Sequence, residues 1–265
     1  MSGSFQRIYA LVLRHIHLWR SSVMRLVDSI YWPAVQMVMW GFMTQYLLPQ
    51  ASFVAQAAGV LLSGLLLWEV VVRGNLSLSI AFLEEMWSRN LGHLFVSPIR
   101  SWEMATGIIV VALLRTLLGL IPVSLMAWAF FGYSVYSLGL PLLAFFIILQ
   151  MFSWSIGLAM SGMIMRVGQS AESFAWAAVF ILMPVSGVYY PVSVLPQWLQ
   201  VISWSMPPAY VFEGMRAILA EKTVHWDMLA IAFGLSLVYL VAGFQIFQWF
   251  FRLSRRHGTL LGQGE

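Results

Sequence analysis

The most informative stretch of the sequence is residues 183–216, which read MPVSGVYYPVSVLPQWLQVISWSMPPAYVFEGMR. An apolar run of membrane length ends here in Tyr189 and Tyr190. Paired aromatic rings favour the membrane–water interface, and the prolines that follow interrupt a helix. We expect one short amphipathic helix around Trp198 and a second that begins at Pro208. Neither is long enough to cross a bilayer, so the stretch predicts a hairpin that dips into the membrane or lies flat on it.

The composition places the whole chain in a membrane. Of its 265 residues, 61% are hydrophobic and only 9% are charged, which is more apolar side chain than one soluble core of this size buries. Several apolar runs of about 20 residues have the length of a membrane-spanning helix. The chain has no cysteine, which excludes a disulfide framework and a thiolate metal site, and its histidines lack the spacing of metal ligands. We therefore expect an all-α membrane protein without a metal site.

We expect a single membrane domain over residues 1–265, with six transmembrane helices. These helices are placed at residues 29–48, 54–75, 104–131, 138–165, 172–190 and 228–251. The other predicted segments are an interfacial helix at 1–27, a cytoplasmic helix at 80–98, the hairpin that ends at 216, and a tail at 252–265. The links after the first and third spans carry no charge, whereas most Lys and Arg residues lie near the opposite ends of the spans. The excess of basic residues therefore indicates topology rather than nucleic-acid binding, with both termini in the cytoplasm and the hairpin outside.

The two cytoplasmic segments are both amphipathic. In residues 1–27, apolar side chains such as Ile8, Val12 and Trp19 share one helical face, and arginines lie opposite. We expect this helix to lie on the inner membrane surface, with its basic face toward anionic headgroups or a cytoplasmic protein. The helix at 80–98 has an exposed mixed-charge face suited to docking, and the alternative is a solvated face packed beneath its own bundle. This face comprises Glu84, Glu85, Ser88 and Arg89.

Two charged residues are predicted to lie inside the membrane. Arg115 falls near the middle of the third span, and Glu69 lies in the second. A lone Arg at mid-depth costs roughly 2.5 to 3.5 kcal/mol even on the lenient insertion scale, so Arg115 needs a partner. We expect either an Arg115–Glu69 pair that only supports the structure, or an Arg115 that faces the translocation path and meets an anionic group of the substrate.

The sequence resembles the permease subunits of ATP-binding-cassette exporters of the type-2 class. The resemblance is carried by SGVYYPVSVLPQWLQ at Ser186–Gln200, PPAYVFEGMR at Pro207–Arg216 and LFVSPIRSWE at Leu94–Glu103, and the order of segments follows that family along the whole chain. One departure is Met206-Pro207-Pro208, where the family commonly has an asparagine before a single proline.

The resemblance implies a subunit of the bacterial inner membrane that dimerises with itself or a sister permease around a central path. Cytoplasmic ATPase subunits would bind ATP and Mg, since this chain has no GxxxxGK[ST] loop to cradle phosphates and no cofactor of its own. The residues implied for coupling to that ATPase are Glu84, Glu85, Met86, Trp87, Ser88, Arg89 and Asn90. Those implied for an outer gate are Tyr189, Tyr190, Pro191, Pro196, Trp198, Glu213 and Arg216.

The expected function is therefore export of a hydrophobic, amphipathic or glycan-linked compound, driven by a partner ATPase. The alternative is an ATP-independent carrier or channel in which Glu69 and Arg115 relay an ion. An intramembrane enzyme would need a catalytic pair, which the sequence does not offer.

Overall fold

A computed structural model describes residues 2–20, 23–47, 52–87, 98–168 and 172–257. These residues form nine α-helices and two short 3₁₀ helices, and no strand is found among them. The helices are α1 (Ser2–Arg20), α2 (Val23–Leu47), α3 (Ser52–Trp87), α5 (Ser101–Phe131), α6 (Leu140–Val167), α7 (Glu172–Val185), α8 (Gln197–Trp204), α9 (Pro207–Glu221) and α10 (Trp226–His257), with η2 (Val135–Leu138) and η4 (Val192–Val194). The predicted all-α class is confirmed for this part of the chain.

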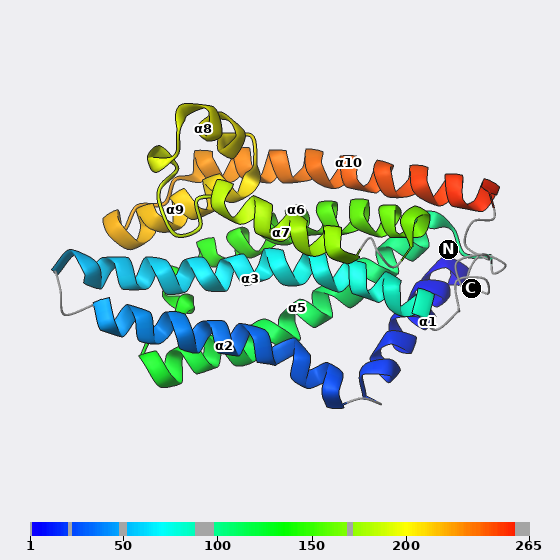
Figure 1. The fold of residues 1–265 in the computed structure, drawn as a ribbon, viewed down its shortest axis with the longest axis horizontal. Helices are drawn as coiled ribbons and strands as arrows, with labels where there is room; N and C mark the ends of the chain where they lie inside the picture. Colours follow the sequence, from blue (N-terminus) through cyan, green and yellow to red (C-terminus); the bar gives the residue numbers. More distant parts are fainter. Residues whose placement is uncertain (1, 21–22, 48–51, 88–97, 169–171, 258–265) are drawn as a thin grey trace.

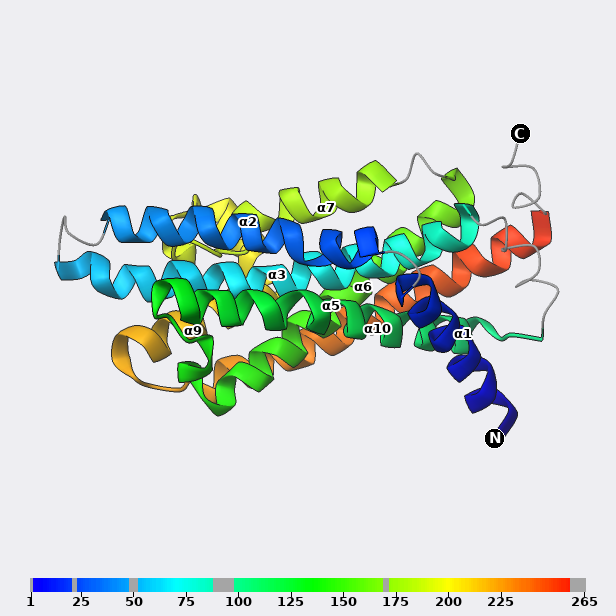
Figure 2. The same cartoon turned by 90° about the horizontal axis from the view of Figure 1, so that it is seen from below.

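The long helices run side by side as an elongated bundle, as Figures 1 and 2 show. Helix α1 and the last turns of α10 lie at one end of the bundle, which we call the α1 end. Helices α8 and α9 lie at the other, which we call the hairpin end. In Figure 2, α1 is inclined to the bundle axis instead of extending it. The predicted interfacial helix and the predicted hairpin are thus at opposite ends of the molecule.

Four described helices are long and apolar enough to cross a membrane. They contain the segments Gly59–Glu85, Ser101–Phe131, Leu140–Arg166 and Trp226–Ser254. Helix α2 has 25 residues, a length of about 37 Å at the usual rise, but its Trp, Tyr, Gln and Pro residues lower its hydropathy. Helix α7 has only 14 residues, or about 21 Å. The structure therefore supports a multi-pass membrane protein, and the six-span arrangement stays a prediction.

Helix α3 corrects the predicted break between the second span and the cytoplasmic helix. We expected the span to end at residue 75 and a separate helix to begin at 80, but α3 continues as one helix of 36 residues to Trp87. The polar residues in this stretch, Asn75, Ser77 and Ser79, are all buried within the bundle. They face neighbouring helices instead of water, so they do not mark a membrane boundary.

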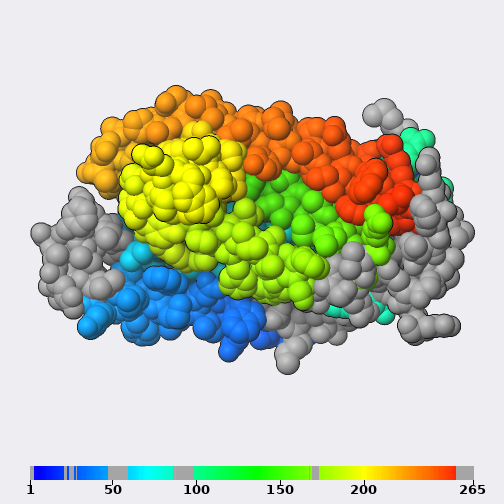
Figure 3. All heavy atoms as spheres, turned by 45° about the horizontal axis from the view of Figure 1, so that its top comes forward, coloured from blue at the N-terminus to red at the C-terminus, as the bar shows by residue number. Residues whose placement is uncertain are grey.

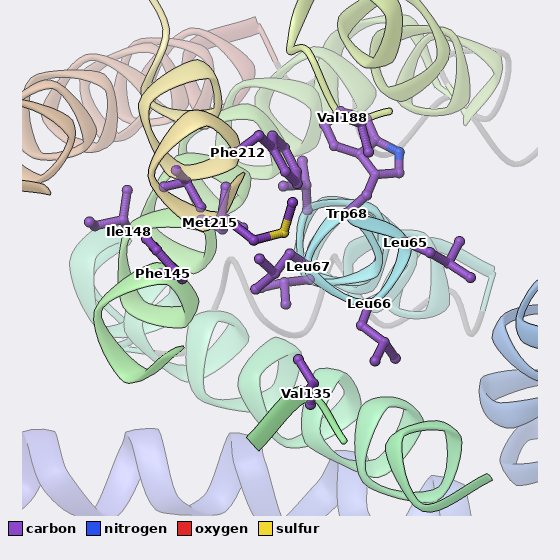
Figure 4. Close-up of a cluster of buried hydrophobic side chains, with 14 of the residues drawn as sticks. Leu65, Leu66, Leu67, Trp68, Val135, Phe145, Ile148, Val188, Phe212 and Met215 are labelled. Atoms are coloured by element: carbon purple, nitrogen blue, oxygen red, sulfur yellow. The ribbon is translucent and has the colours of Figure 1, made fainter. Parts of the chain in front are cut away.

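Two apolar clusters hold the bundle together, one toward each end. Toward the α1 end, Leu11 and Trp19 of α1 pack with residues of α3, α5, α6 and α10. Toward the hairpin end, Phe212 and Met215 of α9 pack against the Leu67–Trp68 turn of α3 (Figure 4). Helices α3, α5, α6 and α10 contribute to both clusters, and α3 supplies the largest share of the cluster at the hairpin end.

Helix α10 approaches the backbone of α6 very closely. A Cβ placed on Gly243 of α10 would lie 2.2 Å from the carbonyl oxygen of Ser155 on α6, so only glycine permits this approach. Small residues allow such close helix packing where lipid offers no hydrophobic driving force. Gly234, nine residues earlier in the same helix, is different, because a Cβ there would have no neighbouring atom within 4 Å.

We expect Gly243→Ala to destabilise the α6–α10 contact by about 1 to 3 kcal/mol, the usual cost of overpacking a core. The thermal midpoint of the detergent-purified protein measures this loss. Gly234→Ala is the matched control, and it is expected to leave the midpoint unchanged or to raise it, because alanine favours a helix over glycine. Equal midpoints for the two variants would contradict the close packing of α6 and α10.

Candidate functional site

Ionisable side chains gather at the α1 end, where α1, α3 and α5 meet. Helix α1 supplies two arginines and a histidine, the last turn of α3 supplies two glutamates, and α5 supplies one residue of each sign. We call this group the charge cluster; it consists of Arg7, Arg14, His15, Glu84, Glu85, Glu103 and Arg115. Its members are up to 108 residues apart in sequence, from Arg7 to Arg115.

Arg7 and Arg14 of α1 bind carboxylates of the bundle. Arg7 donates from Nε and Nη2 to the two oxygens of Glu103, at 2.9 and 2.6 Å, in a bidentate pair. Arg14 donates to Oε2 of Glu85, whose side chain is only 1% exposed. Planar bidentate pairing fixes orientation as well as charge. The expectation that these two arginines face headgroups or a cytoplasmic protein is therefore wrong, because both point at the protein's own acids.

His15 lies between Glu84 and Glu85, at the end of α3, and is fully buried. Its Nδ1 is 3.4 Å from Oε2 of Glu84, and its Nε2 is 3.3 Å from Oε1 of Glu85. Burial by itself would lower the pKa of His15, but its contacts with Glu84 and Glu85 together outweigh burial and raise the pKa. Only the imidazolium has a donor on each nitrogen, so the protonated form is the one that fits two flanking carboxylates.

Arg115 pairs with Glu84 and not with Glu69. Its Nη2 lies 2.8 and 2.7 Å from the two oxygens of Glu84, and its Cζ is 4.9 Å above the ring of Trp19. Glu69 instead lies 3.5 Å from Nε of Arg73, one turn along the same helix. The register of the antiparallel helices explains this correction, since Arg73 lies against Gly119 of α5. Arg115 is one turn nearer the α1 end and reaches the end of α3.

The structure describes only some of the predicted coupling residues. Glu84 and Glu85 are held inside the charge cluster, so the expectation that they form an exposed face is wrong. Trp87 is 50% exposed at the last residue of α3. The side chain of Met86 and the whole of Ser88, Arg89 and Asn90 lie outside the described residues.

The predicted gate residues are brought together at the hairpin end. Tyr189 stacks on Trp40 of α2, with ring centroids 4.6 Å apart. The hydroxyl of Tyr190 donates to the carbonyl of Pro184, at 2.6 Å. Pro191, Pro196 and Trp198 are exposed on the surface of the hairpin.

The ion pair of Glu213 and Arg216 on α9 holds the segment between α7 and α8. Oε1 of Glu213 accepts a hydrogen bond from the backbone amide of Val192, at 2.6 Å, and lies 3.1 Å from Nη2 of Arg216. Both side chains border a surface cavity of about 420 Å³, which is lined by residues of the segment before α8, of α8 and α9, and of the start of α10. Glu213 therefore holds the segment around Val192 against α9, and the pair is accessible from the surface through this cavity.

The two hairpin helices differ in how they are buried. Helix α9 begins at Pro207, as the missing amide hydrogen of proline permits, and inserts Phe212 and Met215 into the bundle (Figure 4). Helix α8 protrudes from the surface next to α7 and α10 (Figure 3), and its Trp198 and Val201 are exposed. The apolar face predicted for α8 thus points away from this chain, toward lipid or another subunit.

Sequence reasoning missed several members of the charge cluster. Arg7 and Arg14 were predicted to face the membrane surface. His15 was considered only as a metal ligand, for which the histidine spacing is unsuitable. Glu103 was not predicted to have a role. One signal was present: the chain has only ten acidic residues, and three of them, at 84, 85 and 103, flank one predicted cytoplasmic segment.

The raised pKa of His15 predicts a pH-dependent contact between α1 and α3. A group whose pKa is raised on folding stabilises the fold fully below its unfolded pKa, about 6.5 for histidine, and loses this contribution as pH rises through the folded pKa. We therefore expect the thermal midpoint to fall as the pH rises above about 6.5, and His15→Gln to remove part of this fall. His17→Gln is the control, because His17 is exposed and its ring bonds to the Leu13 carbonyl of the same helix. A pH profile that His15→Gln leaves unchanged would count against the imidazolium bridge.

The contacts of Glu213 indicate that this side chain stabilises the hairpin. Glu213→Gln weakens the acceptor for the Val192 amide and removes the charge that compensates Arg216, so amide exchange over residues 186–205 should become faster. Hydrogen exchange with mass spectrometry measures this. Glu221→Gln, an exposed change at the end of the same helix, should leave exchange in the hairpin as it is. If both variants exchange like the parent protein, Glu213 does not hold the hairpin.

A comparison with protein-family models agrees with the resemblance in the sequence motifs. The chain matches the family described as ABC-2 type transporter over residues 8–220, from the first half of α1 almost to the end of α9. No curated protein matches the chain. The family match includes both the charge cluster and the hairpin. The chain therefore belongs to the ABC-2 type transporter family and is a membrane-spanning permease of an ABC transporter.

Proposed function

We propose that this chain is the membrane subunit of an ATP-driven exporter and that the charge cluster receives the force of ATP hydrolysis. The hydrolysing subunits would be separate cytoplasmic ATPases that bind ATP and Mg, because this chain has no phosphate-cradling loop. Two copies, or one copy and a sister permease, would enclose the path. The cargo would be a hydrophobic, amphipathic or glycan-linked compound.

The proposed orientation has the α1 end in the cytoplasm of a bacterium and the hairpin end on the outer side of its inner membrane. Arg7, Arg14 and Arg20 on α1 and Arg252 near the end of α10 are at the α1 end, as the positive-inside rule requires for a cytoplasmic side. Helices α2 and α7 would be the remaining two of six spans. Helix α7 is short, and the hairpin that follows it would complete its passage to the outer surface.

The observation that carries the proposal is the continuity of α3. At one end, α3 presents the exposed Trp87 and, immediately before it, the two glutamates that bind α1 and α5. Near the other end, Gly64 lies so close to the hairpin that a Cβ there would be 2.8 Å from the carbonyl oxygen of Val188. A displacement at Trp87 would therefore pass along one rigid helix to the proposed gate.

The same contacts suggest how the cluster transmits motion. Arg14 and His15 clamp the end of α3 to α1, while Arg115 clamps it to α5. Each pair joins a carboxylate that is at most 9% exposed to a cation of another helix, so the three helix ends would move together. The alternative ion relay between Glu69 and Arg115 gains no support, since each residue has its own partner.

A single engineered thiol tests this proposal, since the chain has no cysteine. Trp87→Cys, in membranes that also contain the co-expressed ATPase, should be crosslinked to a polypeptide that carries a GxxxxGK[ST] loop. Trp198→Cys, also exposed but on α8 at the hairpin end, is the matched control and should give no such product. Mass spectrometry identifies the partner.

A permease that purifies without any ATPase, and in which Trp87→Cys gives no more crosslinked ATPase than Trp198→Cys, would refute coupling at the end of α3. Transport by the isolated chain in vesicles without ATP would instead favour the carrier alternative.

A further inference from the structure

An apolar groove opens on the side of the bundle near the hairpin end. It has a volume of about 320 Å³ and lies between α5 and α6, with α3 behind it and η2 across its end. Leu66 and Val70 of α3 form its floor, Leu120 of α5 and Leu143 and Phe146 of α6 form its walls, and Val135 of η2 lies at its end. Figure 4 shows Leu66 pointing from α3 toward α5, away from the cluster around Phe212.

The link between α5 and α6 creates this groove. Gly132 ends α5 and Gly139 precedes α6, both with positive φ, and a Cβ on either glycine would meet no atom within 4 Å. Backbone conformation, not space, therefore requires glycine at both positions. Between them, the η2 turn separates two consecutive helices that pack against α3 far more than against each other. The space left between them is the groove.

The groove is suited to a hydrocarbon chain rather than to water. No charged side chain lines it, and its walls belong to Ser101–Phe131 and Leu140–Arg166, two of the segments apolar enough to cross a membrane. A space of this size would hold on the order of ten water molecules by volume, but an apolar lining gives water too few polar partners. Left empty, the lining would lose dispersion contacts on the open side.

A polar pair marks one side of the groove. The hydroxyl groups of Ser124 and Tyr136 lie 2.9 Å apart, and both residues belong to the lining. Tyr136 is 55% exposed, at the hairpin end where tyrosine would sit in the interfacial region of the membrane. A chain in the groove would thus have a hydrogen-bonding site beside it at the level of lipid headgroups.

We propose that this groove binds an acyl chain of a membrane lipid, with the glycerol ester region of the lipid beside Ser124 and Tyr136. The proposal goes beyond the transport function and does not depend on which compound is exported. A chain in the groove touches protein on three sides, whereas a chain on the outer surface of α10 touches protein on one side and mobile lipid chains on the others. Closer packing against the fixed lining would favour the groove, and we expect a preference on the order of tenfold.

Photochemical labelling tests the proposal. The protein is reconstituted in vesicles of phosphatidylethanolamine and phosphatidylglycerol that contain a small fraction of phosphatidylcholine with a diazirine in one acyl chain. After irradiation, peptide mass spectrometry should find adducts at 117–124 and 142–146 enriched on the order of tenfold per residue over the lipid-facing stretch 237–241 of α10. Equal labelling of the three stretches would overturn the proposal.

Substitutions that fill the groove give a second measurement. Leu143→Trp and Ile121→Trp start from half-exposed residues at the mouth of the groove, and each should reduce labelling at 117–124 severalfold. Leu237→Trp, at a similarly exposed residue of α10, is the matched control and should leave that labelling unchanged. Undiminished labelling in both groove variants would overturn the proposal. So would a disulfide-linked dimer formed through Leu143→Cys, which would show that a second copy covers the groove.

Discussion

The fold depends on pairing four carboxylates inside a bundle of apolar helices with cations. An unpaired charge in such surroundings is costly, so each carboxylate requires a cation within reach. Glu69 takes its partner from its own helix, whereas Glu84, Glu85 and Glu103 take theirs from α1 or α5. The last three pairings fix where α1 lies, and they attach a helix that has too few apolar residues of its own to enter the bundle fully.

Which segments form helices was largely predictable from the sequence, because helix formation follows from local patterns. Apolar runs, the uncharged links and the prolines of the hairpin indicated α5, α6 and the start of α9 to within three residues, and α7 and α10 to within six. The prediction failed where a polar residue had two possible environments. In the sequence, Asn75 indicates a membrane boundary. In the structure it is buried, and its side-chain amide donates a hydrogen bond to the carbonyl of Ala175 on α7.

The charge pairs of the site were not predictable for a related reason. Arg7 and Glu103 are separated by 96 residues, and Arg14 and Glu85 by 71. Helical periodicity told us which residues share a face of α1, but not which way that face turns. Arg7 and Arg14 reach the bundle as well as the apolar face does, because the ends of α3 and α5 present carboxylates, and no pattern within α1 encodes that. Likewise, the choice between Glu69 and Glu84 as the partner of Arg115 depends on the register of α3 against α5, which side-chain contacts set.

The two ends of α3 are held by different kinds of interaction, and this difference bears on how the protein moves. At the hairpin end the contacts are close and apolar: Gly64 touches the backbone at Val188, and the rings of Trp68 and Phe212 are 6.3 Å apart. Such packing resists gradual deformation, so the hairpin should follow α3 as a unit. At the α1 end the contacts are ion pairs between long side chains, several of them partly exposed. These pairs tie the end of α3 to α1 and α5 as one group. Under the coupling proposed above, a force applied near Trp87 would move these three helix ends together, and the close apolar packing would carry the hairpin with the other end of α3.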